Sequence, residues 1–188
     1  MMRVLFLAYP EFADFEIGHV LFLLRKIGKA EIVTSTVTGE AVTSLGGLKV
    51  MADCSVAEVD VTQFNLILIS GGDGIAEVLE NETVSALLQS AVNHSILIAS
   101  ICASALLLGK AGVLHGGSFT CLTHTYEKNI ELFAGANYTG EDIAVWHHVI
   151  TAKGTAFAEF AVETCNQLGM FQTKEQYEAR LKFCKGIS

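Results

Sequence analysis

Residues 96–109 read ILIASICASALLLG, an apolar strand-like run that passes through Cys102 directly into an apolar helix-like run. Such a tight turn between a strand and a helix is typical of a nucleophile elbow, in which the residues two before and two after the nucleophile must be small. Both positions hold serines here, Ser100 and Ser104. The stretch therefore predicts a strand, an elbow at Cys102 and a helix as one continuous unit.

A thiol at this elbow would meet the N-terminus of the helix. The helix dipole and the first unpaired N–H groups stabilise anions, so we expect the pKa of the Cys102 thiol to fall below its usual value of about 8.5. The alternative is a buried structural cysteine, which is what free cysteines usually are. The stretch alone favours neither interpretation.

Strand-like and helix-like segments alternate along the rest of the chain. Mostly continuous apolar runs, as in strands buried on both faces, predict strands at residues 3–8, 30–35, 66–70, 96–99 and 149–152. Helical periodicity predicts helices at residues 15–27, 76–79, 84–92, 103–111, 126–133 and 156–168. This alternation favours an α/β protein, a three-layer sandwich with a mostly parallel central sheet. Residues 36–43 and 46–52 are expected to form a small antiparallel flap, and residues 175–185 a C-terminal helix.

Size and composition describe a globular chain. Its 188 residues fit one domain, 1–188, and no linker or repeat indicates a second. A net charge of −8, with no basic run longer than Arg25-Lys26, argues against nucleic-acid binding, and no apolar segment approaches the roughly 20 residues of a membrane span. Five cysteines without metal-binding spacing argue against a disulfide framework or a metal site and favour a cytoplasmic protein.

The predicted sheet places three loops on one rim. Ligands of such sheets bind beyond the carboxyl ends of the strands, so residues 9–15, residues 71–74 and the turn at Cys102 should meet there. Gly71 and Gly72 end a strand, and their N–H groups, together with that of Ala103, are candidates for an oxyanion pocket. An ordinary helix-entry turn is the alternative interpretation of the two glycines.

Two further side chains are candidates for proton transfer. Glu16 begins the first helix in apolar company, where burial raises a carboxyl pKa and would let the protonated group donate a hydrogen bond to a thiolate. Glu11 and Asp14 are alternative carboxyls for this role, and for all three a solvated first-turn acid is the alternative interpretation. His124 precedes a helix at a rim position suited to acid–base chemistry, although a lone histidine is more often structural. His147 and His148 are expected within a strand.

Taken together, the motifs resemble those of the ThiJ/PfpI superfamily, whose flavodoxin-like fold is also described as class I glutamine-amidotransferase-like. The resemblance covers nearly the whole chain, and within the superfamily it is to the branch of the Parkinsonism-associated protein deglycase. It is carried by Phe15-Glu16-Ile17, Ile69-Ser70-Gly71-Gly72, Ser100-Ile101-Cys102-Ala103, Thr123-His124 and residues 153–161.

The resemblance implies a role for each candidate residue. Cys102 would be the nucleophile, Glu16 its protonated partner and His124 the nearby rim histidine, while the backbone of Gly71, Gly72 and Ala103 would form the anion pocket. It also implies a homodimer. One departure matters, because the branch has glycine and proline where this chain has Ser104-Ala105. Its substrate preference therefore cannot be transferred to this chain.

Two other activities of the superfamily are less expected. In the intracellular-protease branch a histidine directly follows the nucleophile, whereas Ala103 does so here, which weakens a peptidase reading. Glutamine amidotransferases need a late histidine and a glutamate two residues apart, a pattern that this chain lacks.

Two functions of different classes remain open. The first is a cofactor-independent cysteine hydrolase or lyase of the glyoxalase or deglycase type, whose thiolate attacks a reactive carbonyl compound such as methylglyoxal. The second is a redox sensor or stress chaperone, in which an oxidant converts the same thiol to sulfenate or sulfinate without turnover. A protein that binds a metabolite without chemistry is a third possibility, and the motifs do not separate the three.

Overall fold

The computed structural model describes residues 1–187 and is built around a seven-stranded sheet in the order β10-β11-β7-β6-β1-β2-β5. These strands are β1 (Arg3–Leu7), β2 (Glu31–Thr36), β5 (Cys54–Ser55), β6 (Leu66–Ile69), β7 (Leu97–Ile101), β10 (Ile143–Trp146) and β11 (Val149–Ala152). Only β10 pairs with its neighbour in an antiparallel direction. The predicted mostly parallel sheet is therefore confirmed, as are all five predicted strands.

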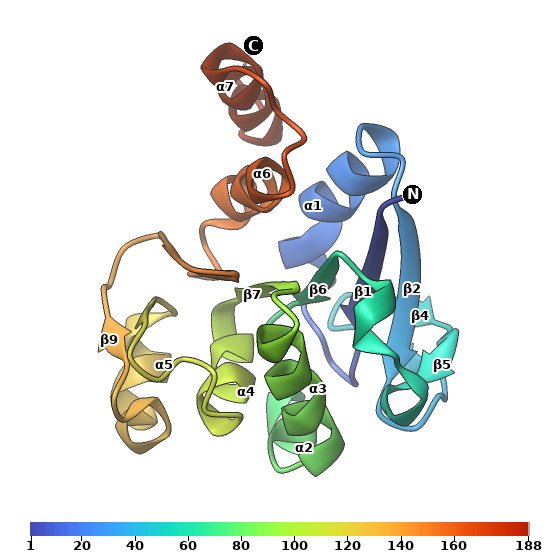
Figure 1. Cartoon of the computed structure of the whole chain (residues 1–188), viewed down its shortest axis with the longest axis vertical. Helices are drawn as coiled ribbons and strands as arrows, with labels where there is room; N and C mark the ends of the chain where they lie inside the picture. Colours follow the sequence, from blue (N-terminus) through green and yellow to red (C-terminus); the bar gives the residue numbers. More distant parts are fainter. Residues whose placement is uncertain (188) are drawn as a thin grey trace.

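Helices cover both faces of the sheet and make three layers (Figure 1). On one face lie α1 (Asp14–Lys26) and α6 (Phe157–Gln167), with α7 (Lys174–Cys184) packed outside α6. The other face carries α2 (Ile75–Leu79), α3 (Glu82–Asn93) and α4 (Ala105–Lys110). The predicted α/β sandwich is confirmed. Among residues 1–187 no helix is both long enough and apolar enough to cross a membrane.

The smaller elements lie at the periphery. The predicted flap is present as β3 (Val42–Thr43) paired antiparallel with β4 (Lys49–Val50), while β8 (Ser118–Phe119) and β9 (Asn137–Tyr138) form a separate parallel pair. The helix predicted at 126–133 is instead α5 (Thr123–Lys128) followed by a 3₁₀ turn, Ile130–Phe133. Asn129 interrupts it with φ −135° and ψ 31°, a conformation that is neither helical nor extended.

The prediction that His147 and His148 lie within a strand is wrong. They form the two-residue turn between β10 and β11, with His147 at a φ of +50°. The sequence signal for β10 was weak because this edge strand is short and only one of its four side chains is fully buried. Short, partly exposed strands carry little hydrophobic pattern.

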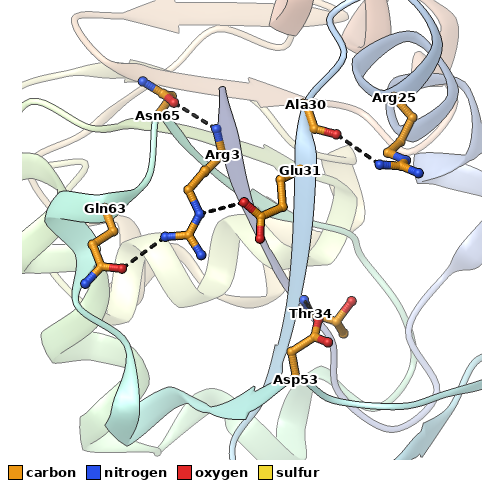
Figure 2. Close-up of polar contacts among 8 residues, drawn as sticks. All are labelled: Arg3, Arg25, Ala30, Glu31, Thr34, Asp53, Gln63 and Asn65. Atoms are coloured by element: carbon orange, nitrogen blue, oxygen red, sulfur yellow. Dashed lines mark hydrogen bonds and ion pairs between the residues drawn. The ribbon is translucent and has the colours of Figure 1, made fainter. Parts of the chain in front are cut away.

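Polar contacts fix the amino ends of β1 and β2, opposite the candidate site (Figure 2). The Arg3 Nε atom donates to Glu31 Oε2 at 2.9 Å, and its Nη1 donates to Gln63 Oε1 at 3.0 Å. Farther along β2, the Thr34 N–H donates to Asp53 Oδ2 at 2.7 Å. The interiors of β1 and β6, by contrast, are buried and apolar.

The strand order switches direction between β1 and β6. The chain continues from β1 to β2 on one side, whereas β6, β7 and β11 follow one another on the other side. The loops after β1 and β6 meet at this point, where the Ala13 N–H donates to the Gly71 carbonyl at 2.7 Å and Phe12 forms a β-bridge with Gly72. A switch point is where sheets of this kind hold their ligands.

Candidate active site

Cys102 occupies a sharp strand-to-helix turn, as predicted. β7 ends at Ile101, Cys102 has a φ of +62°, and a 3₁₀ turn over Cys102–Ser104 leads directly into α4. A non-glycine residue in this left-handed region carries strain of about 1–3 kcal/mol, which the surrounding structure must hold in place. Strain of this kind clusters at functional sites, and among the non-glycine residues with a positive φ Cys102 is the one that also carries a nucleophilic side chain at a strand-to-helix turn.

The two serines of the elbow do more than leave room for the turn. The Ser104 hydroxyl donates to the Ile101 carbonyl at 2.7 Å, and the Ser100 hydroxyl lies 2.7 Å from Ser104 Oγ, to which it can donate. Both side chains are fully buried. Their hydroxyls therefore hold the two sides of the turn together, a role that the size requirement alone did not predict.

Glu16 reaches the thiol from the opposite element, α1. Its side chain is only 2% exposed, because it lies on the helix face that also buries Val20 and Leu23. The carboxyl forms a hydrogen bond with the Cys102 thiol, and its Oε2 accepts the Gly71 N–H at 2.7 Å. Cys102 and Glu16, 86 positions apart and predicted independently, are thus brought together.

Two glycines permit this close approach. A Cβ atom on Gly71 would lie 2.6 Å from Cys102 Cβ and 2.8 Å from Glu16 Oε2. A Cβ on Gly154 would lie 2.7 Å from both Cys102 Sγ and Glu16 Oε1. No side chain fits at either position, so the backbone on both sides packs directly against the thiol–carboxyl pair.

Burial controls the protonation of this pair. Desolvation raises the pKa of Glu16 from 4.5 to about 7 and outweighs the hydrogen bonds from Cys102 and Gly71, which lower it. Desolvation also raises the pKa of Cys102 from 9.0 to about 12, assisted by the charge of Glu16 and its hydrogen bond, and opposed by the Ala103 N–H. The raised carboxyl pKa was predicted. The lowered thiol pKa was not found, because burial and the neighbouring carboxylate outweigh the N–H groups of one short turn.

A raised carboxyl pKa makes stability depend on pH. Below pH 4.5 Glu16 is protonated in both states. Between pH 4.5 and about 7 the unfolded chain ionises while the folded state keeps the proton, so the folded state loses relative stability until the loss is complete above a pH of about 7. We expect Glu16→Gln to be more stable than the wild type by about 3 kcal/mol at pH 8, with the difference shrinking toward pH 4.5. Urea unfolding at several pH values measures this, and a pH-independent difference would contradict it.

The three backbone candidates for an oxyanion pocket differ in what they can offer. The Gly71 N–H already donates to Glu16, so in this structure it is not free to stabilise an oxyanion. Gly72 lines the cavity beside the thiol, with a φ of +145°. The Ala103 N–H donates to the Cys102 sulfur and is therefore adjacent to any carbon bonded to that sulfur.

The geometry gives no support to a direct role for His124. It lies in the first turn of α5, its side chain is exposed, and it is not among the residues that line the cavity at Cys102. Leu122, two residues earlier, lines the cavity instead. The catalytic role of His124 stays a prediction.

A cavity of about 370 Å³ opens over Cys102 and is mostly apolar. Its walls include Gly154, Thr155 and Phe157, which the sequence motifs contained but to which no role was given. The signal was available, since these residues follow β11 and so lie at the same rim of the sheet. Within residues 1–187 no group of three or more His, Cys, Asp or Glu side chains is arranged to hold a metal ion.

Comparisons with known proteins point to one family. The model of the DJ-1/PfpI family matches residues 2–167. Deglycase TK1284 of Thermococcus kodakarensis is 30% identical over 146 residues, 77% of this chain and 85% of that protein. Glutathione-independent glyoxalase DJR-1.2 of Caenorhabditis elegans is 29% identical over 143 residues, 75% of each. The crystal structure of DJ-1 superfamily protein Atu0886 from Agrobacterium tumefaciens has a TM-score of 0.86 and 31% identity, with 97% of both chains covered.

Proposed function

This chain belongs to the DJ-1/PfpI family, as its motifs predicted, and from that premise we propose that it is a cysteine-dependent enzyme acting on reactive 2-oxoaldehydes. The observation that carries the proposal is the Cys102–Glu16 pair, a thiol on a strained elbow hydrogen-bonded to a buried carboxyl whose pKa is about 7. Relatives named as a glyoxalase and a deglycase support the reaction class.

In the proposed reaction Glu16 acts as the base that makes the thiol a nucleophile. The Cys102 sulfur attacks the aldehyde carbon while the Glu16 carboxylate accepts the thiol proton, giving a hemithioacetal whose oxygen is then protonated. A carboxyl with a pKa near neutrality is suited to both accept and return a proton at pH 7. The raised thiol pKa is then no obstacle, because the thiolate forms only as the substrate is attacked.

The remaining steps need only a proton shift and one water. The hydrogen on the former aldehyde carbon leaves as a proton to Glu16 and returns to the neighbouring carbonyl carbon, while the hydroxyl proton moves from the oxygen of the first carbon to that of the second. Together these two transfers convert the hemithioacetal into a 2-hydroxyacyl thioester. Water then cleaves the thioester, releasing a 2-hydroxy acid and restoring the thiol. The aldehyde carbon is oxidised and the ketone carbon reduced, so the reaction balances without an external oxidant.

Removing the thiol tests the proposal. Cys102→Ala is expected to abolish multiple turnover of methylglyoxal to the 2-hydroxy acid, measured by chromatography, because no covalent intermediate can form. Cys54→Ala, which removes a half-buried thiol on β5, is the matched control and should retain turnover. Undiminished turnover in Cys102→Ala would contradict the proposal.

The redox-sensor alternative has less support from the site. Sensor cysteines react with peroxide as thiolates, and burial raises the pKa of Cys102 to about 12. Stoichiometric consumption of peroxide by Cys102, without turnover of any 2-oxoaldehyde, would favour the sensor instead.

The homodimer implied by the family resemblance stays a proposal. Sedimentation velocity over a range of protein concentrations tests it: a dimer is expected throughout, and a monomer at every concentration would contradict the proposal.

A further inference from the structure

The cavity at Cys102 has an apolar wall that the proposed reaction does not use. Phe15 of α1, Phe157 of α6 and Leu122 at the start of α5 line it, joined by Leu45 between β3 and β4. Attack by the thiol and transfer of protons need only Cys102, Glu16 and nearby N–H groups. The wall is therefore available to bind the unreactive part of a substrate.

Aromatic contacts hold part of this wall in place. The Phe157 ring stacks on His19 with centroids 5.8 Å apart and an angle of 20° between the planes. Its edge contact with Phe15 has centroids 6.2 Å apart and planes at 86°. A ring fixed on two sides binds a flat apolar group with little loss of side-chain freedom.

The charges at the cavity all have one sign. Its charged lining residues are Glu16 and Asp73, both carboxyl groups, and none is a lysine, arginine or histidine. Lys153 precedes Gly154, but its ammonium group lies 3.6 Å from Asp142 and does not line the cavity. Among the described residues Asp73 has no ion-pair partner. An anionic substrate would meet one or two carboxylates and no cation.

We infer that the substrate of this site is a 2-oxoaldehyde with an apolar, aromatic-sized substituent and no negative charge, selected by the wall at Phe157 and by the Asp73 carboxylate. This inference rests on the proposed function, because it names the substrate class of that reaction. A cavity of about 370 Å³ is large for methylglyoxal alone and lies within the range typical of small-molecule sites, about 300–1,000 Å³.

Competing substrates test the inference through turnover. The first ratio compares phenylglyoxal with methylglyoxal: we expect kcat/KM to be about 10- to 100-fold higher for phenylglyoxal, the usual effect of burying a group of this size. The second ratio compares phenylglyoxal with 4-carboxyphenylglyoxal: we expect kcat/KM to be at least about 10-fold higher for phenylglyoxal, because the added carboxylate meets Asp73. Phe157→Leu should reduce the first ratio, and Asp73→Lys the second. Glu131→Lys makes the same charge change on an exposed residue outside the cavity and should leave the second ratio unchanged.

A binding measurement separates this inference from the proposed function. Acetophenone and benzoate carry the same ring but cannot be turned over, and their protection of Cys102 against iodoacetamide can be followed by peptide mass spectrometry. Protection by acetophenone but not by benzoate supports the inference. If in addition no 2-oxoaldehyde is turned over, the proposed function is wrong while the inference about the cavity still holds. Two results would overturn the inference. One is equal protection by acetophenone and benzoate; the other is Cys102-dependent turnover with the same kcat/KM for methylglyoxal, phenylglyoxal and 4-carboxyphenylglyoxal.

Discussion

Glu16→Gln is expected to lower kcat/KM for a 2-oxoaldehyde by about 10²- to 10⁴-fold, while alkylation of Cys102 by iodoacetamide shifts to lower pH. Turnover falls because an amide cannot accept the thiol proton. Alkylation becomes easier because the variant removes the charge and the hydrogen bond through which Glu16 raises the pKa of Cys102, although burial still keeps that pKa high. One substitution thus moves two properties of the same thiol in opposite directions.

Steady-state kinetics and pH-resolved peptide mass spectrometry measure the two effects on the same preparations. Glu163→Gln makes the same chemical change on α6, outside the cavity, and serves as the control. The wild-type midpoint is informative by itself. If Glu16 were a protonated donor to a resting thiolate, alkylation of the wild type would have its midpoint below about 8.5, and the assignment of Glu16 as the base would be wrong.

The elements of the site that could be predicted are those with a local signal. The elbow at Cys102 is visible because an apolar strand and an apolar helix meet with no room for a loop. The environment of Glu16 follows from helical period, since it shares a face with Val20 and Leu23. Its pKa, raised by burial, therefore had a cause that could be identified in the sequence.

Properties set by distant packing could not be predicted. The raised pKa of Cys102 depends on how deeply the turn is buried and on a carboxylate 86 positions away in the chain. The position of Gly154 after β11 places it at the rim, but its direct contact with the thiol–carboxyl pair depends on β11 ending beside β7, a pairing that apolar strand runs do not specify. His124 failed to reach the cavity because α5 begins at Thr123, which leaves the histidine exposed in its first turn.

Gly154→Ala is expected to lower kcat/KM at least about 10²-fold, although it adds a single methyl group. The new Cβ would lie 2.7 Å from both Cys102 Sγ and Glu16 Oε1, closer than non-bonded atoms allow, so the thiol and the carboxyl must separate. Displacing reacting groups by about 1 Å costs about this much in rate. The backbone of Gly154 is not in the left-handed region, so alanine adds no left-handed backbone strain there. The substitution therefore acts by separating Cys102 from Glu16.

Kinetics and unfolding together distinguish this from general destabilisation. Overpacking should cost about 1–3 kcal/mol of stability, leaving a folded protein whose kcat falls across the whole pH range. Gly18→Ala on α1 is the matched control, because no atom lies within 4 Å of its added Cβ, and it should keep full activity while stabilising the helix by about 0.5–1 kcal/mol. Wild-type turnover in a folded Gly154→Ala protein would show that direct contact between Cys102 and Glu16 is not needed for catalysis.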